Sequence, residues 1–370
     1  MAELYVGALS GTSMDGIDVA LVRFSPQPEM IESHFQPFPP EFRKQLAALA
    51  EPGDNEIDRL GSIDVQLGQQ FARAIRDLLS KAKVEAVNVR AIGCHGQTIR
   101  HRPNSEPRFT LQIGDPNVIA VETGIRVVAD FRRKDIALGG QGAPLVPAFH
   151  DSVFRSRQVD RIICNIGGIA NVTVLPRGQF SPVLGFDTGP GNTLLDGWCQ
   201  RMLGEPMDRD GMLAARGRIQ PGLLQKLLED PYFAQRPPKS TGPEYFSMEW
   251  LMRHLEAFGR PGVADVQATL LALTVHTIAD AIKTLPMLKQ PEIYICGGGA
   301  NNIAMMRALQ VQLPTSKVGK TDELGIAADW VEALAFAWLA RQRLQEQPGN
   351  LPVVTGASRP AVLGSIYLPG

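Results

Sequence analysis

Apolar and polar positions alternate in blocks whose period changes along the chain. Two short apolar runs, 4–9 and 19–24, flank the polar, glycine-rich stretch 10–18, a pattern that predicts two strands joined by a hairpin turn. Residues 56–82 differ, because apolar side chains recur there at steps of three and four from Leu60 to Leu78. That spacing places them on one face of a helix. The chain is therefore expected to open with a hairpin and to continue into amphipathic helix.

Beyond residue 82, short apolar runs alternate with longer amphipathic stretches. The expected strands lie near 86–95, 109–113, 125–130, 161–167, 169–175, 183–187 and 292–296, and the expected helices near 40–50, 193–203, 221–229, 244–259, 263–285, 301–312 and 326–345. Asp115 and Pro116 are typical of an N-cap and the first position of a helix. Strands that alternate with helices predict an α/β fold.

Each half of the chain opens with the same design. Residues 161–175 repeat the opening hairpin around a pair of glycines, although no sequence repeat is present. Two such halves predict two lobes with a ligand-binding cleft between them.

Composition narrows the class of protein. The 370 residues carry a net charge of −1, which argues against a nucleic-acid partner, and 44% are hydrophobic, which argues against disorder. The 4 cysteines are scattered, as expected for buried thiols in a reducing compartment. The sequence has no recognisable signal peptide and no apolar run of the ~18 residues that a membrane helix needs. We expect a cytoplasmic enzyme without a membrane partner.

The first candidate site is the turn of the opening hairpin. It comprises Gly11, Thr12, Ser13, Met14, Asp15, Gly16, Ile17 and Asp18. Glycines at both ends of a tight turn present backbone N–H groups, and hydroxyls add to them, which is typical of a phosphate cradle. Asp15 and Asp18 would be repelled by phosphate, but they could hold a magnesium ion through water. The alternative is an ordinary hairpin turn, because Asp-Gly is common in such turns.

Two further glycine-rich turns resemble the first. One lies between the strands of the second hairpin and supplies Gly167, Gly168 and Asn171; the other follows the strand near 292–296 and supplies Gly297, Gly298, Gly299 and Asn301. Glycines at these places let a phosphate or a flat ligand approach the backbone. Together with the first turn they indicate a nucleotide site. A hairpin with a structural Asn is the alternative for the second hairpin.

Asp187 stands at a strand end before the turn 188–192. A carboxylate at the mouth of a cleft is a candidate general base. The helix expected to start near Asn192 would direct its positive end toward an anionic ligand. The alternative role for Asp187 is that of a turn or N-cap residue.

A set of polar residues follows several strands of the first half. His95 and Gln97 come after the strand near 86–95, and Asp130 and Arg132 come after the strand near 125–130. Ligands bind at such strand ends in open α/β sheets, and Arg favours carboxylates and phosphates. The alternative is a solvated loop with internal salt bridges.

Six blocks in this order resemble the anhydro-N-acetylmuramic acid kinase family: GTSMDGID, CHGQT, ADFRRKD, NIGGIANVT, GFDTGPGN and CGGGANN. The resemblance spans about residues 5–365. It implies the two-lobed fold of actin, Hsp70 and the sugar kinases, with a mixed sheet flanked by helices in each lobe and ATP in the cleft between them. We expect lobe I to comprise residues 1–135 and about 348–370, and lobe II residues 136–347.

The resemblance also implies a reaction. ATP and water convert 1,6-anhydro-N-acetylmuramate into N-acetylmuramate 6-phosphate and ADP, a step of peptidoglycan recycling and amino-sugar catabolism. Asp187 would deprotonate the water that attacks C1 while O6 receives the γ-phosphoryl group. The three glycine-rich turns would hold ATP and Mg²⁺. The sugar would contact His95, Gln97, Asp130, Arg132 and Asn192. A homodimer is also implied.

One departure from the wider superfamily concerns the first turn. Sugar kinases of this fold usually carry an Asp just before the first glycine turn, whereas this chain has Ala8, Leu9 and Ser10 there. Asp15 and Asp18 would then take over the role next to magnesium.

Two other functions remain open. A conventional kinase that phosphorylates a free sugar hydroxyl would share the ATP blocks and differ only in the acceptor pocket. A non-catalytic sugar-sensing regulator usually carries an added helix-turn-helix module, for which a chain whose first strand starts near residue 4 leaves no room.

Overall fold

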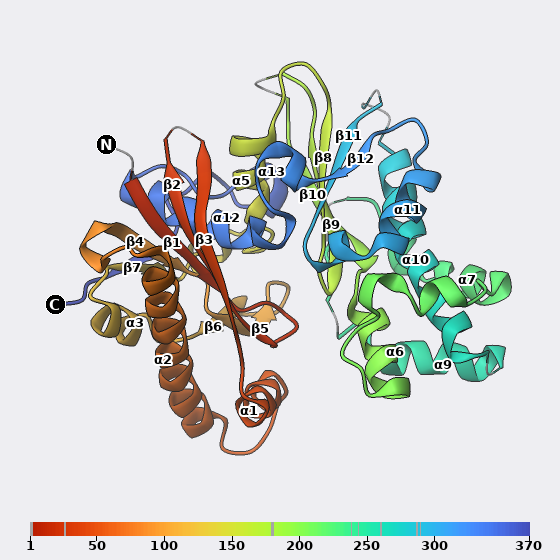
Figure 1. Ribbon diagram of the computed structural model, residues 1–370, viewed down its shortest axis with the longest axis horizontal. Coiled ribbons are helices and arrows are strands. Elements are labelled where there is room, and N and C mark those ends of the chain that lie inside the picture. The colour runs from red at the N-terminus through yellow and green to blue at the C-terminus, as the bar shows by residue number, and fades with distance from the viewer. Residues whose placement is uncertain are drawn as a thin grey trace. The chain divides into compact units, whose positions relative to one another are not determined.

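The fold is that of a computed structural model, which describes residues 3–25, 27–178, 181–237, 239–242, 244–259, 261–285, 288 and 290–370 (Figure 1). The chain divides into two compact units. Unit 1 comprises Met1–Val153 together with Trp330–Gly370, and unit 2 comprises Phe154–Asp329.

The strands of unit 1 are β1 (Glu3–Leu9), β2 (Gly16–Phe24), β3 (Pro28–Pro37), β4 (Val89–Cys94), β5 (Gln97–Arg102), β6 (Phe109–Ile113), β7 (Val127–Ala129) and β13 (Ser365–Tyr367). Its helices are α1 (Pro40–Ala50), α2 (Glu56–Ala82), α3 (Pro116–Thr123), α4 (Arg133–Ala137), α5 (Val146–Phe154, whose last residue is assigned to unit 2), α12 (Val331–Leu344) and α13 (Pro352–Thr355).

Unit 2 contains the strands β8 (Arg161–Ile166), β9 (Ile169–Leu175), β10 (Leu184–Pro190), β11 (Glu292–Cys296) and β12 (Val318–Lys320). Its helices are α6 (Thr193–Leu203), α7 (Pro221–Leu228), α8 (Pro231–Ala234), α9 (Met248–Phe258), α10 (Val263–Lys283) and α11 (Ile303–Gln312).

The main sheet of unit 1 has the order β13-β7-β4-β1-β2-β3. The predicted hairpin is confirmed, since β1 pairs antiparallel with β2 and Leu9 lies opposite Asp18. β1, β4 and β7 run parallel to one another. Their carboxyl ends therefore meet at one edge, which places Ser10, His95 and Asp130 along the same side of the sheet.

Helices cover both faces of this sheet. Val6 and Ala8 of β1 belong to a buried core with Leu67 and Phe71 of α2. The residue between them, Gly7, faces the opposite way, where a Cβ atom would lie 1.8 Å from the carbonyl oxygen of Ala333 in α12. Alternation along β1 thus separates the two faces, and the glycine lets the α12 backbone lie directly on the strand.

The boundaries of the units differ from those that the sequence suggests. α12 was expected in lobe II, but it packs on β1 and β4 and belongs to unit 1. Gly93 of β4 repeats the close approach, since a Cβ there would lie 2.0 Å from the Phe336 carbonyl oxygen. A periodic apolar helix shows that it is buried, but not against which sheet. Unit 1 is therefore larger than the expected residues 1–135 and 348–370.

The sheet of unit 2 has the order β10-β9-β8-β11-β12. β8 and β9 form the predicted second hairpin, and β11 pairs parallel with β8. α10 packs against β9 and β10. Both units thus have a mixed sheet flanked by helices, as the α/β prediction requires.

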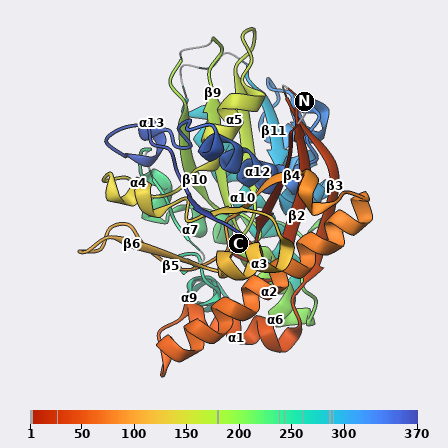
Figure 2. The same cartoon turned by 90° about the vertical axis from the view of Figure 1, so that its left-hand side faces the viewer.

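Several elements have no counterpart among the predictions. β3, β12, β13 and α5 were not expected, and the strand near 109–113 has a partner, β5, that was not foreseen. Figure 2 shows the β5–β6 hairpin extending away from the main sheet of unit 1. The N-cap prediction is confirmed, because the Asp115 side chain accepts a hydrogen bond from Asn117 N.

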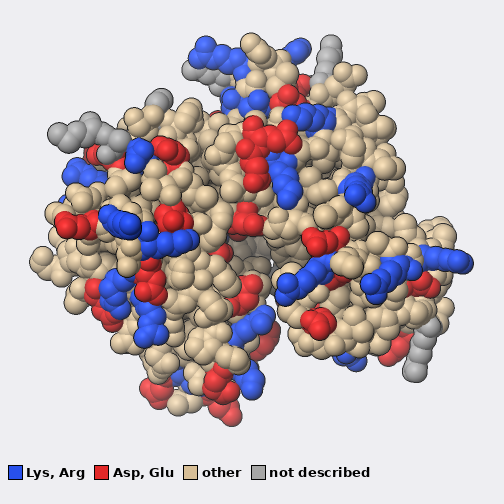
Figure 3. Space-filling view, viewed as in Figure 1, with Lys and Arg blue, Asp and Glu red and all other residues tan. Residues whose placement is uncertain are grey.

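The surface carries both signs of charge. On the face shown in Figure 3, Lys and Arg side chains are interspersed with Asp and Glu, in keeping with the net charge of −1. In the described part of the chain no single helix has the length and apolar character of a membrane span, although the bent pair α9 and α10 meets both criteria jointly.

Candidate active site

The hairpin turn between β1 and β2 is compact. The Ser13 hydroxyl donates a 2.7 Å hydrogen bond to Asp15 Oδ1, and Met14 N donates to the carbonyl of Gly11 at 3.1 Å. Met14 has φ 49°, a left-handed conformation that tightens the turn. Thr12 and Ser13 are exposed, so their hydroxyls and the surrounding backbone are accessible to a ligand.

The second half of this turn is structural. A Cβ at Gly16 would lie 2.5 Å from Gln36 O, and the Ile17 side chain is completely buried. Only the backbone of these two residues is therefore left to meet a nucleotide.

The two predicted magnesium ligands are both in this hairpin. Asp15 is exposed, and Asp18 lies on β2 opposite Leu9. Among the described residues, no group of three His, Cys, Asp or Glu side chains is placed to hold a metal ion. An oxygen-only pair fits magnesium held through water and phosphate, because this ion keeps several of its waters.

Next to the turn, Ser10 and Gln97 form a buried pair. The Ser10 hydroxyl donates to Gln97 Oε1 at 2.7 Å, and Gln97 Nε2 donates to the carbonyl of Thr98 at 3.1 Å. Gln97 is only 1% exposed. Its amide therefore ties the end of β1 to the start of β5, a role that the strand-end position did not reveal.

His95 and Arg132 are in direct contact, as their grouping in the sequence suggests. Arg132 Nε donates to His95 Nε2 at 2.9 Å, so the ring proton must reside on Nδ1, which lies 3.0 Å from the Gly96 carbonyl. Burial, and then the Arg132 charge, hold the pKa of His95 well below its usual value. His95 is thus a neutral imidazole that orients Arg132.

Arg132 is itself fixed on several sides. Its Nη1 donates to the Gly142 carbonyl at 2.8 Å, and the carboxylates of Glu332 and Asp135 stabilise its charge. Burial nevertheless lowers its pKa to about 10. Asp130 follows β7 with φ 59°, and burial raises the pKa of its carboxyl group. Glu332, on α12, has no counterpart among the predicted site residues.

The glycine pair between β8 and β9 is capped by the start of α6. The N–H groups of Gly191 and Thr193 donate to the Gly168 carbonyl, and Asn192 N donates to the Gly167 carbonyl at 2.8 Å. The Asn192 side chain adds a bond to the Ile166 carbonyl. The N–H groups of Gly191, Asn192 and Thr193 are thus used within the chain and are not available to an anion.

The glycines after β11 lie against the same turn. A Cβ at Gly297 would be 2.3 Å from Asn165 Oδ1, and one at Gly299 would be 2.4 Å from the Ile166 side chain. Gly298 is different, because its Cβ would meet only the Asn192 amide, at 3.7 Å. Two of the three predicted nucleotide turns therefore converge within unit 2, and Gly298 presents the open backbone.

Asn301 is engaged at the edge of this loop. Its Nδ2 donates to both carboxylate oxygens of Asp329, and Lys320 Nζ donates to its Oδ1 at 3.2 Å. The polar group thus forms a small ionic cluster on the surface of unit 2.

Asp187 is held from three sides by the segment 232–241. Asp187 N donates to the Lys239 carbonyl at 3.1 Å, the Tyr232 phenol donates to the Asp187 carbonyl at 2.8 Å, and Thr241 N donates to Asp187 Oδ2 at 3.0 Å. Burial raises the pKa of the Asp187 carboxyl group to about 6. A fixed carboxylate with that pKa is suited to accept a proton near neutral pH.

The sequence predicts no role for the segment 232–241. Its contacts with Asp187 are made mainly by main-chain groups, which leave no residue pattern to recognise. The Thr241 hydroxyl is also buried without a hydrogen-bond partner among the described residues.

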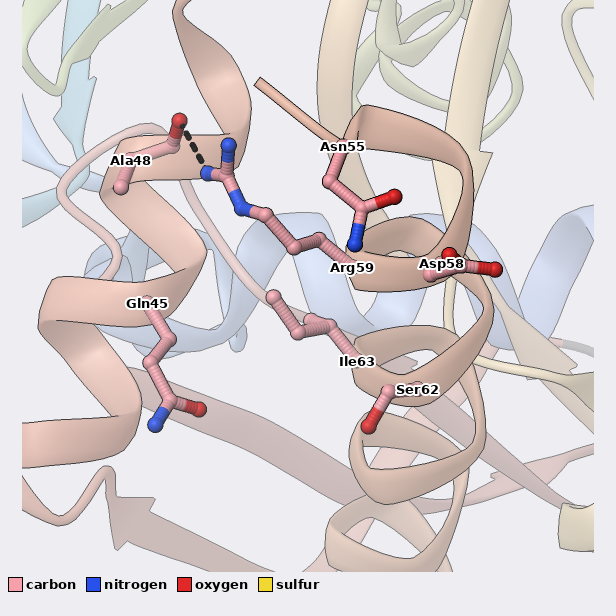
Figure 4. Close-up of a pocket in the computed structure, with 7 residues that line it drawn as sticks. All are labelled: Gln45, Ala48, Asn55, Asp58, Arg59, Ser62 and Ile63. Carbon is pink, nitrogen blue, oxygen red and sulfur yellow. Dashed lines mark hydrogen bonds between the residues drawn. The ribbon is translucent and has the colours of Figure 1, made fainter. Parts of the chain in front are cut away.

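A separate cavity of about 630 Å³ lies in unit 1 between α1 and α2. It is lined by Gln45, Ala48, Asn55, Asp58, Arg59, Ser62 and Ile63 (Figure 4). Arg59 Nη2 donates to the Ala48 carbonyl, so the guanidinium group that lines the cavity is bonded to the last turn of α1. None of the predicted site residues lines it.

Comparison with known proteins identifies the family. The model of the anhydro-N-acetylmuramic acid kinase family matches residues 3–369. A protein of that name from Shewanella pealeana is 56% identical over 365 residues, covering 98% of both chains. Another from Coxiella burnetii is 52% identical over 365 residues, covering 99% of this chain and 97% of its own. The chain therefore belongs to the anhydro-N-acetylmuramic acid kinase family.

Proposed function

We propose that the protein uses ATP and water to convert 1,6-anhydro-N-acetylmuramic acid into N-acetylmuramic acid 6-phosphate, with Asp187 as the general base. The observation that carries the base assignment is the geometry of Asp187. Thr241 N fixes Oδ2, while Oδ1 has no hydrogen-bond partner among the described residues. That oxygen is left to receive a proton from water.

The substrate requires such a base. O6 of the anhydro sugar is bonded to C1, so there is no free 6-hydroxyl to deprotonate. Asp187 takes a proton from water, the water oxygen bonds to C1, and the C1–O6 bond breaks. O6 then bonds to the γ-phosphorus and ADP leaves. Positioning and charge stabilisation supply most of the acceleration in reactions of this type.

The remaining residues of the proposed site would bind the nucleotide, magnesium and the carboxylate of the substrate. The turn at 11–15, the glycines 167–168 and Gly298 offer backbone to the nucleotide. Asp15 and Asp18 would hold magnesium through water, and the ion would add positive charge beside the phosphates. Arg132 is our candidate for the substrate carboxylate, because its guanidinium is fixed by His95 and Gly142.

Other sugar contacts and the assembly rest on the family resemblance. We propose that Asp130 and Asn192 contribute to the sugar site, that the enzyme acts in the cytoplasm in peptidoglycan recycling, and that it is a homodimer. Size-exclusion chromatography with light scattering would measure the oligomeric state.

The reaction is tested by following oxygen. Turnover in H₂¹⁸O should place the label on C1 of the product and none in the phosphate. Early time points and a product-only incubation correct for exchange at the reducing carbon. Label in the phosphate would mean that water attacks phosphorus. N-Acetylmuramic acid should not serve as acceptor, because it has no C1–O6 bond that attack by water could open to deliver O6 to the γ-phosphorus. Its efficient phosphorylation would identify a conventional sugar kinase instead.

A further inference from the structure

A lysine lies beside the candidate base without forming an ion pair with it. Lys239 Nζ donates to the carbonyls of Tyr232 and Phe233 at 3.2 and 3.4 Å, and it lies 4.6 Å from the centre of the Tyr232 ring. No ion pair within 4 Å joins Lys239 to Asp187 in the described part of the chain. The ammonium group is therefore held at a distance from the carboxylate.

The same lysine is linked to Asp187 through the backbone. Its carbonyl accepts the hydrogen bond from Asp187 N, and two residues later Thr241 N bonds to Asp187 Oδ2. Tyr232, whose ring faces the ammonium group, donates its phenol to the Asp187 carbonyl. One short segment thus fixes the backbone of Asp187, one carboxylate oxygen and a nearby positive charge.

This arrangement resolves a conflict that any buried base must meet. Burial favours the protonated, inactive carboxyl group, whereas a close ion pair would favour a carboxylate too weak to remove a proton. A cation held by carbonyl oxygens and an aromatic ring has an intermediate effect on the pKa of the base. It stabilises the carboxylate electrostatically, but it cannot move close enough to form an ion pair with it.

We propose that Lys239 is a positioning residue for the reaction, a fixed positive charge that keeps Asp187 ionised while leaving its Oδ1 atom free for water. The proposal rests on the proposed function, in which Asp187 is the base.

The electrostatics around Asp187 are consistent with that role. Burial raises the pKa of Asp187, while the hydrogen bond from Thr241 N and, after it, the Lys239 charge lower it. Burial lowers the pKa of Lys239, and the nearby Asp187 opposes that effect. Among the described residues, Tyr232 is the other titratable side chain that faces Asp187, and burial raises the pKa of its phenol above the usual value. Tyr232 therefore stays neutral over the pH range in which the enzyme is assayed. Of these two side chains, only Lys239 carries a charge that acts on the Asp187 carboxyl group.

The test is the acidic limb of the pH profile of kcat/KM. In Lys239→Met we expect this limb to move to higher pH by about one unit, as for removal of a nearby opposite charge. The variant should therefore lose less kcat/KM at pH 8.5 than at pH 6. Lys239→Arg should keep the limb near its original position. Tyr232→Phe, the matched control, removes one hydrogen bond but no charge, and its limb should not move.

A second variant separates charge from folding. Lys239→Cys followed by alkylation with 2-bromoethylamine restores an ammonium group in the folded protein, and the native cysteines at 94, 164, 199 and 296 are buried. The limb should shift in the thiol form and return after alkylation. If Lys239→Met and the unalkylated Cys variant fold, as circular dichroism would show, but keep the wild-type limb, the proposal is wrong.

The failure of the proposed function would be distinct. If Asp187→Asn retains substantial activity and an unchanged pH profile, Asp187 is not the base. If Asp187→Asn is inactive while the Lys239 variants titrate like the wild type, the base stands and only the role of Lys239 is overturned.

Discussion

Asn171 of β9 lies directly opposite Asp187 of β10 in the antiparallel ladder. Side chains of directly opposed residues share one face of a sheet and stand about 5 Å apart at Cβ. A residue expected to meet the nucleotide and the residue expected to activate water are thus neighbours, although 15 positions separate them in the chain. In the proposed function, this pairing places a nucleotide contact and the general base side by side on one sheet.

The first prediction concerns the pH dependence of the wild-type enzyme. Because Asp187 must be ionised to accept a proton, and its pKa is about 6, kcat/KM should fall tenfold per unit below that value and level off above it. Asp187→Asn should lower kcat by about 10²–10⁴ and abolish this limb. An Asp187→Asn enzyme that loses activity but keeps the limb would assign the titration to another group.

The second prediction uses the Asn171 pairing. Asn171→Asp would place a second carboxylate opposite Asp187, and like charges raise one another's pKa. The acidic limb should then move upward by about one pH unit, and the KM for ATP should increase through repulsion of phosphate. Asn171→Ala serves as the control: it should affect the KM for ATP and leave the limb in place.

The third prediction is that Asp187, the proposed base, lowers the free energy of unfolding at neutral pH. The folded-state pKa of Asp187 exceeds its usual value, so the unfolded chain releases the proton first, and stability falls as pH rises from about 4 to about 6. Above pH 7 the burial cost is fully present, on the order of 3 kcal/mol. Asp187→Asn should therefore unfold at a higher temperature at pH 7.5 and show no such gain at pH 4. Equal gains at both values would contradict the electrostatic explanation.

The fourth prediction separates two adjacent glycines. Gly298→Val should fold normally, because the added Cβ meets only the Asn192 amide at 3.7 Å, but it should raise the KM for ATP by crowding the open backbone. Gly297→Ala should instead lower the melting temperature, since Gly297 has φ 76° and no space beside Asn165. Calorimetry and nucleotide titration distinguish the two. A Gly298→Val enzyme with normal ATP binding would remove this glycine from the nucleotide site.

The fifth prediction concerns a buried carboxylate that links distant parts of unit 1. Asp135 is 0% exposed and accepts hydrogen bonds from Asn350 Nδ2, Thr355 Oγ1 and Gly142 N at 2.6, 2.8 and 2.8 Å. Asp135→Ala leaves these donors without a partner and should lower the free energy of unfolding by about 3 kcal/mol or more. Denaturant titration measures the loss.

A matched control for Asp135 is an exposed ion pair. Lys226 and Glu229 approach to 3.1 Å with side chains that are 59% and 55% exposed. Lys226→Ala should cost less than about 1 kcal/mol, because solvent screens such pairs. Similar losses for both variants would refute the role given to Asp135.

Local sequence patterns predicted those parts of the candidate site that lie within one short segment of the chain. The glycine-rich turns at 10–18 and 167–168 follow from apolar runs that end at glycines. Asp187 was expected at a strand end, but β10 continues past it to Pro190, so that its strand was predicted and its place in the strand was not. The segment 232–241 was not, because Thr241 reaches Asp187 through a main-chain N–H that every residue except proline possesses. Contacts between segments far apart in the chain, made by the backbone, have no signature in a single sequence.

The same reason explains what the sequence left open elsewhere. Gln97 stands beside His95 at a strand end, and nothing in the pattern shows that its amide is bonded to Ser10 rather than exposed to a ligand. The sequence predicted that the last long stretch is a helix, but it did not show on which sheet that helix packs. Gly7 and Gly93, which accept it, are separated from it by more than 230 residues and lie within ordinary strands.

The packing of α12 on β1 and β4 also has a consequence for biosynthesis. Unit 2 is formed by a continuous stretch of chain, so all of its strands and helices have been made before α12 leaves the ribosome. The first sheet of the protein, in contrast, must wait with one face uncovered until residues 331–344 emerge. The unit that starts to be synthesised first is therefore the one that is completed last, and its exposed apolar face is the surface that a chaperone would meet during translation.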